Sequence, residues 1–391
     1  MSLSNGRAYL AIPGPSVMPD AVLRAMHRAS PNIYEGELHD LTASLIPDLQ
    51  AVARTKAQVA IYIGNGHAAW EASLTNILSR GDTVLVLATG RFCIGWGEVA
   101  AGLGARVETL NFGESAPIDL DKVAEYLAGD KTHRIKAVLA VHVDTSTSVK
   151  NDIPGLRAVL DDLAHPALLC VDCIASLGCD RFEMDAWGVD LMVAGCQKGL
   201  MTPAGLSFVW FNEKADAARG DCVTSYWDWR PRAAPAQYYQ YFYGTAPTHH
   251  LYGLRAALDM IIAEGLDNVF ARHATLAQTI WAAFDRWSVQ GPLHLNIADP
   301  AQRSHAVTSA GVGSPLGDDL RRWCEHRCGL TLGIGLGRTP TDAYFRIGHM
   351  GHVNPPMILG ALATIDAGLK ALKIPHGRGA LEAASSVIAA A

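Results

Sequence analysis

Lys198 stands out in this 391-residue sequence because its setting suits covalent chemistry. It follows the apolar segment Asp190–Ala194, precedes Gly199, and has no acidic residue beside it to act as an ion-pair partner. A lysine removed from water keeps part of its amine neutral, and a neutral amine can form a Schiff base with an aldehyde. The alternative is a surface lysine whose methylene chain packs on apolar neighbours while its ammonium reaches water.

Asp172 is a candidate partner in the same chemistry. It ends the apolar segment Ala167–Val171, at the carboxyl end of what should be a buried central strand. A buried carboxylate is costly unless a cation neutralises it. The protonated ring nitrogen of pyridoxal phosphate (PLP) is such a cation, and in that state the ring withdraws electrons from a bound amino acid. The alternative is that Asp172 caps a helix beginning at Cys173.

A glycine-containing turn, Gly64-Asn65-Gly66-His67, could supply a phosphate site. It follows the strand-like segment Val59–Ile63 and opens a stretch of helical period, Ala68–Leu78. Backbone N–H groups and the positive end of the helix dipole both favour an anion at such a turn. An ordinary strand-to-helix turn explains the same residues, so the turn gains weight only together with Lys198 and Asp172.

The elements that must position these groups alternate along the first two thirds of the chain. Short apolar runs rich in β-branched residues predict strands at Gln58–Ile63, Thr83–Leu87, Lys136–His142, Ala167–Asp172, Asp190–Ala194 and Leu206–Phe211. Stretches of helical period lie between several of them, at Ala68–Leu78, Leu120–Leu127 and Ile153–Leu163. This alternation is typical of an α/β fold with a mostly parallel central sheet and flanking helices. Such sheets carry their chemistry at the carboxyl ends of their strands.

The pattern changes near residue 260. Two long helical stretches are followed by strand-like pieces and a helical tail, at Arg255–Glu264, Val269–Trp287, His294–Ile297 and Ala343–Ile347. We therefore predict an N-terminal arm over residues 1–20, a large cofactor-binding domain over 21–260, and a smaller α+β domain over 261–391. The arm contains Ile12-Pro13-Gly14-Pro15 and is expected to pack against the second domain or a partner subunit.

Composition narrows the class of protein. Apolar residues make up 49% of the chain, and the 38 acidic residues outnumber the 32 Lys and Arg, which argues against a nucleic-acid partner. No apolar run approaches the roughly 20 residues that cross a membrane, and the N-terminus lacks a signal-peptide pattern. Eight scattered cysteines indicate buried thiols in a reducing cytoplasm. No metal site is expected, because Cys324, His326 and Cys328 do not complete a ligand set.

Together these motifs resemble those of class V, fold-type I PLP enzymes, and among them the alanine/serine–glyoxylate (serine–pyruvate) aminotransferase group. The matching segments follow the family's order over nearly the whole chain, at Gly64–Glu71, His142–Thr147, Val171-Asp172, Gln197–Leu206, Tyr226–Trp229, Ile262–Gly265 and Phe345–Gly351. As a set these motifs are specific for the group. The resemblance implies a fold-type I PLP-transferase with a smaller C-terminal domain, working as a homodimer with shared active sites.

The resemblance also implies roles for single residues around the cofactor. Lys198 would form the aldimine with PLP and then carry the proton, Asp172 would bind the ring nitrogen, and Thr145 would lie beside the ring hydroxyl. Phe92 would stack on the ring, and Thr245 would reach the phosphate from a neighbouring subunit. The remaining phosphate contacts would come from Asn65, Gly66, His67 and Gln197.

The implied activity is a ping-pong transamination. A small amino acid, alanine or serine, would give its amino group to glyoxylate or pyruvate. Arg346 would grip the substrate carboxylate as a bidentate fork. The sequence does not fix the donor, because alanine, serine, aspartate and pyridoxamine differ by contacts worth about a few kcal/mol.

Some positions depart from the serine–glyoxylate pattern. Tyr34 stands where a His-Arg pair is common, Phe242 replaces a tyrosine, and Arg338 is an additional arginine before Arg346. Arg338 is either a solvated loop charge or a second substrate contact, and Tyr34 is a further candidate contact. Tyr34, Phe242 and Arg338 resemble pyridoxamine–pyruvate aminotransferases, which gives the alternative function. The Asn65-Gly66-His67 turn, which suits a phosphate, favours the first interpretation.

Two rival functions stay open from the sequence. A PLP-dependent lyase or cysteine desulfurase needs a reactive thiolate near the cofactor, and Cys328 is the candidate by position. A catalytically silent relative that serves as a binding protein would have no need of Lys198 and Asp172, and both are present.

Overall fold

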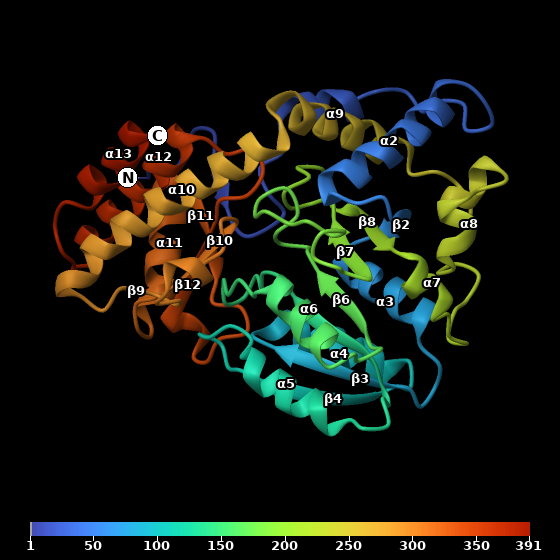
Figure 1. Cartoon of the computed structure of the whole chain (residues 1–391). Coiled ribbons are helices and arrows are strands. Elements are labelled where there is room, and N and C mark those ends of the chain that lie inside the picture. The colour runs from blue at the N-terminus through green and yellow to red at the C-terminus, as the bar shows by residue number, and fades with distance from the viewer. Residues whose placement is uncertain (1) are drawn as a thin grey trace.

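The computed structural model describes residues 2–391 and contains two lobes, each built on one sheet (Figure 1). The larger sheet has seven strands in the order β2-β8-β7-β6-β5-β3-β4. β8 runs antiparallel to β2 and β7, and the other neighbours are parallel. The strands are β2 (Gln58–Gly64), β3 (Thr83–Ala88), β4 (Arg106–Asn111), β5 (Ile135–Val141), β6 (Leu168–Asp172), β7 (Leu191–Gly195) and β8 (Gly205–Phe211). The predicted mostly parallel sheet is confirmed.

Helices cover both faces of this sheet because its strands are apolar on both sides. In β6, Leu169 and Val171 belong to one core and Leu168 and Cys170 to the other, as expected from the alternation of side chains along a strand. The first core is shared with α1 (Asp20–Met26), α2 (Glu37–Ala53), α5 (Leu120–Gly129), α6 (Ile153–Asp162) and α9 (Thr248–Glu264). The second is shared with α3 (Gly66–Ile77), α4 (Arg91–Gly102), α7 (Glu213–Ala217) and α8 (Trp229–Ala233).

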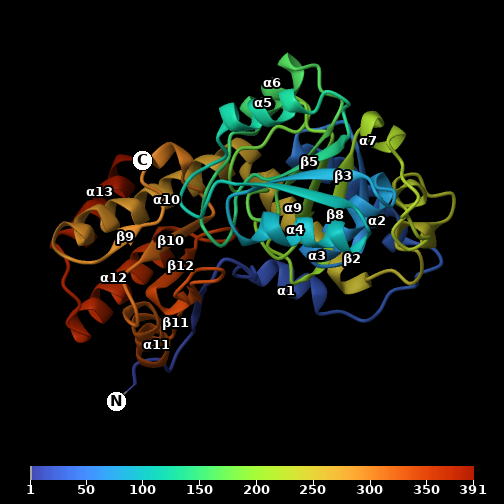
Figure 2. The ribbon, with the colours of Figure 1, turned by 90° about the horizontal axis from the view of Figure 1, so that it is seen from below.

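The smaller lobe confirms the predicted second α+β unit (Figure 2). Its sheet has the order β1-β11-β12-β10-β9, in which β1 and β11 are parallel and the other neighbours antiparallel. The strands are β1 (Tyr9–Ala11), β9 (His294–Leu295), β10 (Val307–Gly311), β11 (Leu330–Ile334) and β12 (Tyr344–Gly348). They share a core with α10 (Leu266–Trp287), α11 (Leu316–Cys328), α12 (Pro355–Ala371) and α13 (Ala380–Ala390).

The N-terminal arm links the two lobes. Its strand β1 joins the smaller sheet, which is the first of the two packing arrangements expected for the arm. Beyond β1, the Ser16 N–H donates to the carbonyl oxygen of Gln197 at 2.9 Å, and the Ser16 hydroxyl donates to that of Lys198 at 2.7 Å. The arm therefore lies against the segment that carries the candidate lysine. The two cores meet inside α10, between Val269 and Leu276, while the proposed domain limits themselves stay predictions.

Other expectations concern membranes, thiols and metals. Over residues 2–391, no helix combines the length and the hydropathy that a membrane span requires. All eight cysteines are free thiols. Within the same residues, no three His, Cys, Asp or Glu side chains are grouped so that they could hold a metal ion.

Candidate active site

A cavity of about 290 Å³ lies where β5, β6 and β7 end. The N-terminus of α3 closes one side, and Gly14 and Pro15 of the arm close another. Most of the predicted site residues line it, namely Asn65, Gly66, His67, Phe92, Thr145, Asp172, Gln197 and Lys198. The three motifs identified in the sequence thus share one cavity, at the edge of the sheet where parallel strands carry their chemistry.

Lys198 follows β7 and is buried. Its Nζ donates a hydrogen bond to the carbonyl oxygen of Pro13, and a Cβ atom at Gly14 would overlap its side chain. Burial, together with the nearby guanidinium of Arg346, lowers the pKa of Lys198 from 10.5 to about 7. A large part of this amine is therefore uncharged at neutral pH, which is the form that attacks a carbonyl carbon.

Asp172 ends β6 and is almost fully buried. Its Oδ1 accepts the backbone N–H of Ile174 at 2.7 Å, and its Oδ2 accepts the indole N–H of Trp70 at 2.8 Å. Both donors are neutral, so neither supplies the cation that a buried carboxylate needs. Burial raises the pKa of Asp172 from 3.8 to about 7, and the charge of Asp144 acts in the same direction.

The start of α3 offers polar groups to an anion. The Asn65 side chain caps the helix by accepting the backbone N–H of His67 at 3.1 Å. Glycine is required at Gly66, because a Cβ atom there would overlap Ile174. Across the cavity, Oε1 of Gln197 is buried and has no hydrogen-bond partner among residues 2–391. Because Oε1 is an acceptor, it does not itself bind an anion, and the groups suited to a phosphate are the backbone N–H groups at the helix N-terminus and the amide N–H groups of Gln197.

Two aromatic rings form a wall of the cavity. Phe92 lies in the first turn of α4, and its ring packs edge-on against Trp70 with 6.2 Å between centroids. The backbone N–H of Phe92 donates to Oδ2 of the buried Asp144 at 3.0 Å, which fixes the start of α4. A planar ligand ring can stack on such a wall.

Arg346 lies on β12, behind Thr145. Its Nε donates to the carbonyl oxygen of Ile334 at 2.7 Å, and its Nη1 donates to that of Thr145 at 2.9 Å. Burial lowers its pKa from 12.5 to about 10, so it remains a cation at neutral pH. Because its two hydrogen bonds go to carbonyl groups, its charge is available to a substrate carboxylate.

Four predicted residues do not line this cavity in a single chain: Arg346, which lies behind Thr145, and three that lie farther away. Arg338 donates to the carbonyl oxygen of Glu114 at 2.8 Å, lies 3.3 Å from the Glu114 carboxylate, and covers the ring of Tyr344. Tyr34 is 84% exposed, in the segment between α1 and α2. Thr245 is exposed in the segment before α9. Their roles toward substrate and cofactor stay predictions.

Trp70 and Asp144 are site residues that the sequence analysis did not assign. Trp70 stands one helical turn after His67, so its place on the same face of the predicted helix was a usable signal. Asp144 adjoins Thr145 and accepts backbone N–H groups from Phe92 and Ser146. No local signal indicated that the arm would cover Lys198, since this contact joins residues far apart in the chain.

Comparison with known proteins decides the family. The sequence profile described as aminotransferase class-V matches residues 8–336. The chain belongs to this family. It is 36% identical to the serine–glyoxylate aminotransferase of Hyphomicrobium methylovorum over 95% of this chain and 93% of that one. It is 37% identical to the L-aspartate–glyoxylate aminotransferase of Paracoccus denitrificans, over 93% and 91%. The crystal structure of pyridoxamine–pyruvate aminotransferase from Mesorhizobium loti superposes with a TM-score of 0.89 at 25% identity, over the full length of both chains.

This class-V aminotransferase uses pyridoxal 5′-phosphate, and its cavity fits that cofactor. Asp172 lacks a bound cation, and the ring nitrogen of PLP supplies one when protonated. The start of α3 and the amide N–H groups of Gln197 supply donors for the phosphate. Lys198, uncharged in part, suits the aldehyde.

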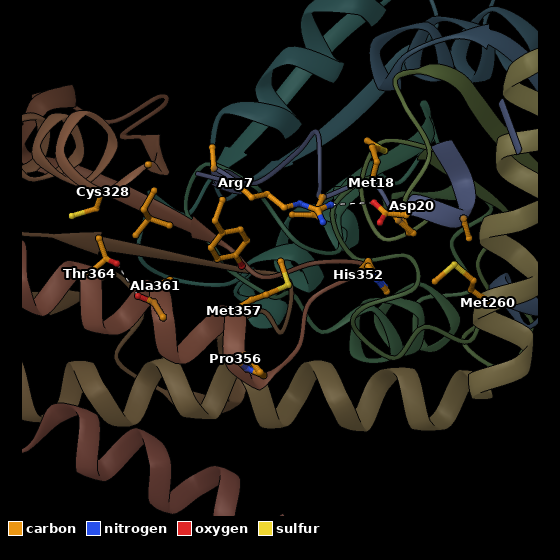
Figure 3. Close-up of a pocket in the computed structure, with 18 of the residues that line it drawn as sticks. Arg7, Met18, Asp20, Met260, Cys328, His352, Pro356, Met357, Ala361 and Thr364 are labelled. Carbon is orange, nitrogen blue, oxygen red and sulfur yellow. Dashed lines mark hydrogen bonds and ion pairs between the residues drawn. The ribbon is translucent and has the colours of Figure 1, made fainter. Parts of the chain in front are cut away.

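Cys328, the thiol considered for a desulfurase, lies in a different place. It lines a separate cavity of about 710 Å³ between the arm, α1 and α12. Figure 3 shows Cys328 near Thr364 and Ala361, neither of which lines the cavity of Lys198. The thiolate that a desulfurase requires is therefore not beside the lysine, and the desulfurase interpretation has no support from this site.

We expect Trp70→Phe to lower kcat about tenfold while the chain keeps its fold. The substitution removes one hydrogen bond to a carboxylate, an interaction worth roughly 1.5–3 kcal/mol. The pKa of Asp172 should then rise further, and the pH profile of kcat should shift with it. Trp96→Phe is the matched control, since the Trp96 indole N–H has no acceptor among residues 2–391. Equal kcat values and pH profiles in the two variants would contradict a role for Trp70 in holding Asp172.

We also expect the apoprotein to take up PLP at a rate that rises with pH and is half-maximal near pH 7. The lowered pKa of Lys198 means that its reactive, neutral form accumulates above about 7 and not above 10.5. Stopped-flow absorbance measures this rate. In Arg346→Gln the midpoint should move to higher pH, because a nearby positive charge is lost. A wild-type midpoint near 10 would show that the amine is not perturbed.

Proposed function

We propose that this chain catalyses a ping-pong transamination in which alanine or serine gives its amino group to glyoxylate or pyruvate. The observation that carries the proposal is one cavity that holds a buried, partly neutral Lys198 and a buried Asp172, with the cation Arg346 next to it. A volume of about 290 Å³ suits the cofactor with a small amino acid. The named relatives that act on glyoxylate support this choice of acceptor.

We assign the proton transfers to Lys198 and Asp172. When bound, PLP supplies an aldehyde that captures the amino group and a ring that withdraws electrons. Lys198 would hold PLP in the resting enzyme, and its freed amine would accept the α-proton of the donor and later give it back. Asp172 keeps the ring nitrogen protonated, and Trp70 keeps the Asp172 carboxylate in place.

The remaining residues bind and orient. Thr145 and Phe92 hold the ring on its edge and its face, while Arg346 binds the carboxylate of donor and acceptor in turn. The phosphate contacts come from Asn65, Gly66, His67 and Gln197. Because the arm residue Pro13 covers Lys198, we expect the arm to limit the access of water to the amine.

Absorption spectroscopy tests the proposal. The purified holoenzyme should show a visible band, and alanine or serine should bleach it while a keto acid is released. Adding glyoxylate or pyruvate should restore the band. If no chromophore is bound and one appears only with pyridoxamine and pyruvate, the alternative function, a pyridoxamine–pyruvate aminotransferase, takes first place. The observation that supports this alternative is the similarity to the Mesorhizobium loti structure.

We expect Arg346→Gln to raise KM for both the amino donor and the keto acid, with kcat/KM lower by about 10- to 100-fold. Loss of a charged, bidentate contact to a carboxylate costs roughly 1.5–3 kcal/mol. Arg338→Gln is the comparison variant. Because Arg338 is engaged with Glu114, its loss should leave alanine kinetics within about threefold and affect only donors with a second acidic group. Steady-state kinetics with alanine and aspartate separate the two arginines.

We propose further that the enzyme is a homodimer in which Thr245, and with it Tyr34, serves the neighbouring site. Both are exposed and lie away from their own cavity. Ile63 and Ile94 are exposed apolar side chains beside the phosphate turn and Phe92, where a partner would cover them. Such patches are typical of interfaces.

Hybrid dimers test the sharing of sites. Lys198→Ala and Thr245→Arg chains should each be inactive alone. Refolded together, they should regain activity, because one site then combines an intact lysine with an intact threonine from the other chain. No recovery in hybrids whose dimeric state is verified by light scattering would place Thr245 in its own chain's site, or outside both.

We propose the cytoplasm as the location of the enzyme. The support is that all eight cysteines are unpaired and six of them are buried. Cell fractionation with an antibody to the chain tests this, and recovery outside the cytoplasmic fraction would contradict it.

A further inference from the structure

A second cleft, of about 790 Å³, lies on the other side of segment 142–151 from the cofactor cavity. Val143 and Thr145 line the cofactor cavity, whereas His142 and Lys150 line the cleft, and the two share no lining residue. The start of α6, the helix α10 and segment 299–305 form its other walls, so both lobes contribute. Neither the proposed transamination nor the cofactor uses this cleft.

The floor of the cleft contains a buried polar group that the chain leaves unsatisfied. His142 is 2% exposed, and its Nδ1 has no hydrogen-bond partner within residues 2–391. The adjacent Asp180 is 1% exposed but is satisfied, because it accepts the Ser304 hydroxyl and the backbone N–H of His305, each at 3.0 Å. Buried polar groups are seldom left unpaired, and because His142 lines the cleft, a ligand bound there can reach its imidazole ring.

The cleft is lined by charged side chains of both signs, and some of these side chains have groups free to bind a ligand. Lys150 lines it, and in the part of the chain that the structure describes its ammonium has no ion-pair partner. Asp152 and Asp299 each cap a helix with one carboxylate oxygen, which accepts a backbone N–H at 2.9 Å. Their second oxygens remain available. A ligand that matches this cleft therefore presents both a negative and a positive group.

One wall of the cleft is apolar. Phe270 and Ala274 come from α10, and Trp187 comes from the segment before β7. These side chains can cover an aliphatic or aromatic group of a ligand whose charged ends face Lys150 and the aspartates.

We propose that this cleft binds a free α-amino acid with an apolar side chain, as a zwitterion, at a site separate from the substrate site. Lys150 and the His142 imidazole receive the carboxylate, and Asp152 and Asp299 receive the ammonium. The apolar side chain lies against Phe270. Arg181 and Asp267 also line the cleft but pair with each other, so the charges left for a ligand are Lys150 and the two aspartates, which a ligand with both charges matches better than a plain anion or amine.

Occupancy of the cleft reaches the cofactor cavity through segment 142–151. The two ends of the segment are joined, since Val143 and Lys150 form a β-bridge and the Asn151 N–H donates to the carbonyl oxygen of His142 at 2.9 Å. Between these ends the segment carries Thr145, whose carbonyl oxygen accepts from Arg346. A ligand that bridges His142 and Lys150 therefore restrains the segment that positions Thr145. We expect such a ligand to change the KM of the amino-transfer reaction more than its kcat.

Calorimetric titration of the holoenzyme with N,N-dimethyl-L-phenylalanine tests the proposal. This probe is a zwitterion, but its tertiary amine cannot condense with an aldehyde, so the substrate site offers it no covalent capture. We expect one saturable site per chain and affinity that falls about tenfold or more in Lys150→Met. Lys131→Met, at an exposed lysine outside the cleft, should bind like the wild type. N-acetyl-L-phenylalanine, which lacks the ammonium, should bind at least tenfold more weakly.

Hydrogen exchange locates the bound probe independently of the variants. Protection should appear in residues 142–151 and 299–305, and Arg346→Gln should retain it. Thermal unfolding of Lys150→Met should match that of Lys131→Met, which shows that the loss of binding is not a loss of fold. The absence of saturable binding, unchanged affinity in Lys150→Met, or protection confined to the cofactor cavity would each overturn the proposal.

Discussion

Replacing Lys198 by alanine is expected to lower kcat/KM for amino transfer by about 10⁴-fold, the upper end of what a positioned general base contributes. In the proposed mechanism, the substitution removes both the amine that holds the cofactor and the group that moves the proton. No other described lysine lines the cavity, so none can take over either task. Burial and the charge of Arg346 lower the pKa of this amine, and a surface lysine would not have this lowered pKa.

The measurement is single-turnover transfer from alanine or serine to PLP supplied in excess. Lys198→Ala should bind PLP more weakly and without covalent capture, so reduction with borohydride should leave no cofactor on the chain. Added ethylamine should restore part of the rate, because a free amine can enter the space left by the side chain. Lys131→Ala is the control for the loss of a lysine elsewhere. Full activity in Lys198→Ala would refute the assignment of the base.

The central sheet could be predicted from sequence because its inner strands are apolar on both faces. β6 and β7 lie within a residue or two of their predicted limits. β4 was not predicted, since it is an edge strand whose residues, among them Arg106 and Glu108, are exposed or half-buried. β10 was also missed, because Val307–Gly311 contains little apolar signal and becomes a strand only by pairing with β12.

The candidate site could be predicted to the extent that its residues follow strands. Lys198 and Asp172 each end a buried strand, and the rule that parallel sheets work at this edge brings them together. Contacts between distant segments gave no such signal: the arm residue Pro13 covers Lys198, and the Arg346 guanidinium reaches the carbonyl oxygen of Thr145. The role proposed for Tyr34 could not be derived from its local sequence either, because an exposed side chain carries no sign of whether a neighbouring chain covers it.

Asp172→Asn is expected to leave PLP bound and to lower kcat about 10³-fold. The two side chains have the same shape, but the amide carries no charge to hold a proton on the ring nitrogen. Two opposite charges about 4 Å apart at an effective dielectric constant near 20 attract by about 4 kcal/mol, which corresponds to about three powers of ten. The proposed phosphate contacts at Asn65 and Gln197 and the proposed capture by Lys198 do not depend on this charge, so cofactor content should stay close to that of the wild type.

Asp190→Asn is the control that distinguishes loss of the charge beside the cofactor from loss of any buried carboxylate. Asp190 is also buried, precedes β7 and pairs with Lys214 at 3.1 Å, but it does not line the cofactor cavity. Its substitution should lower the unfolding temperature, because the two Asp190 oxygens accept from the Leu169 N–H and the Asn212 side chain and an amide can accept only one of these bonds. The value of kcat should stay within about threefold of the wild type. Asp172→Asn also loses one of its two acceptor oxygens, but it should lower kcat far more than Asp190→Asn does, because only Asp172 lines the cofactor cavity. A variant at Asp172 that kept wild-type kcat would mean that the ring nitrogen needs no proton in this enzyme.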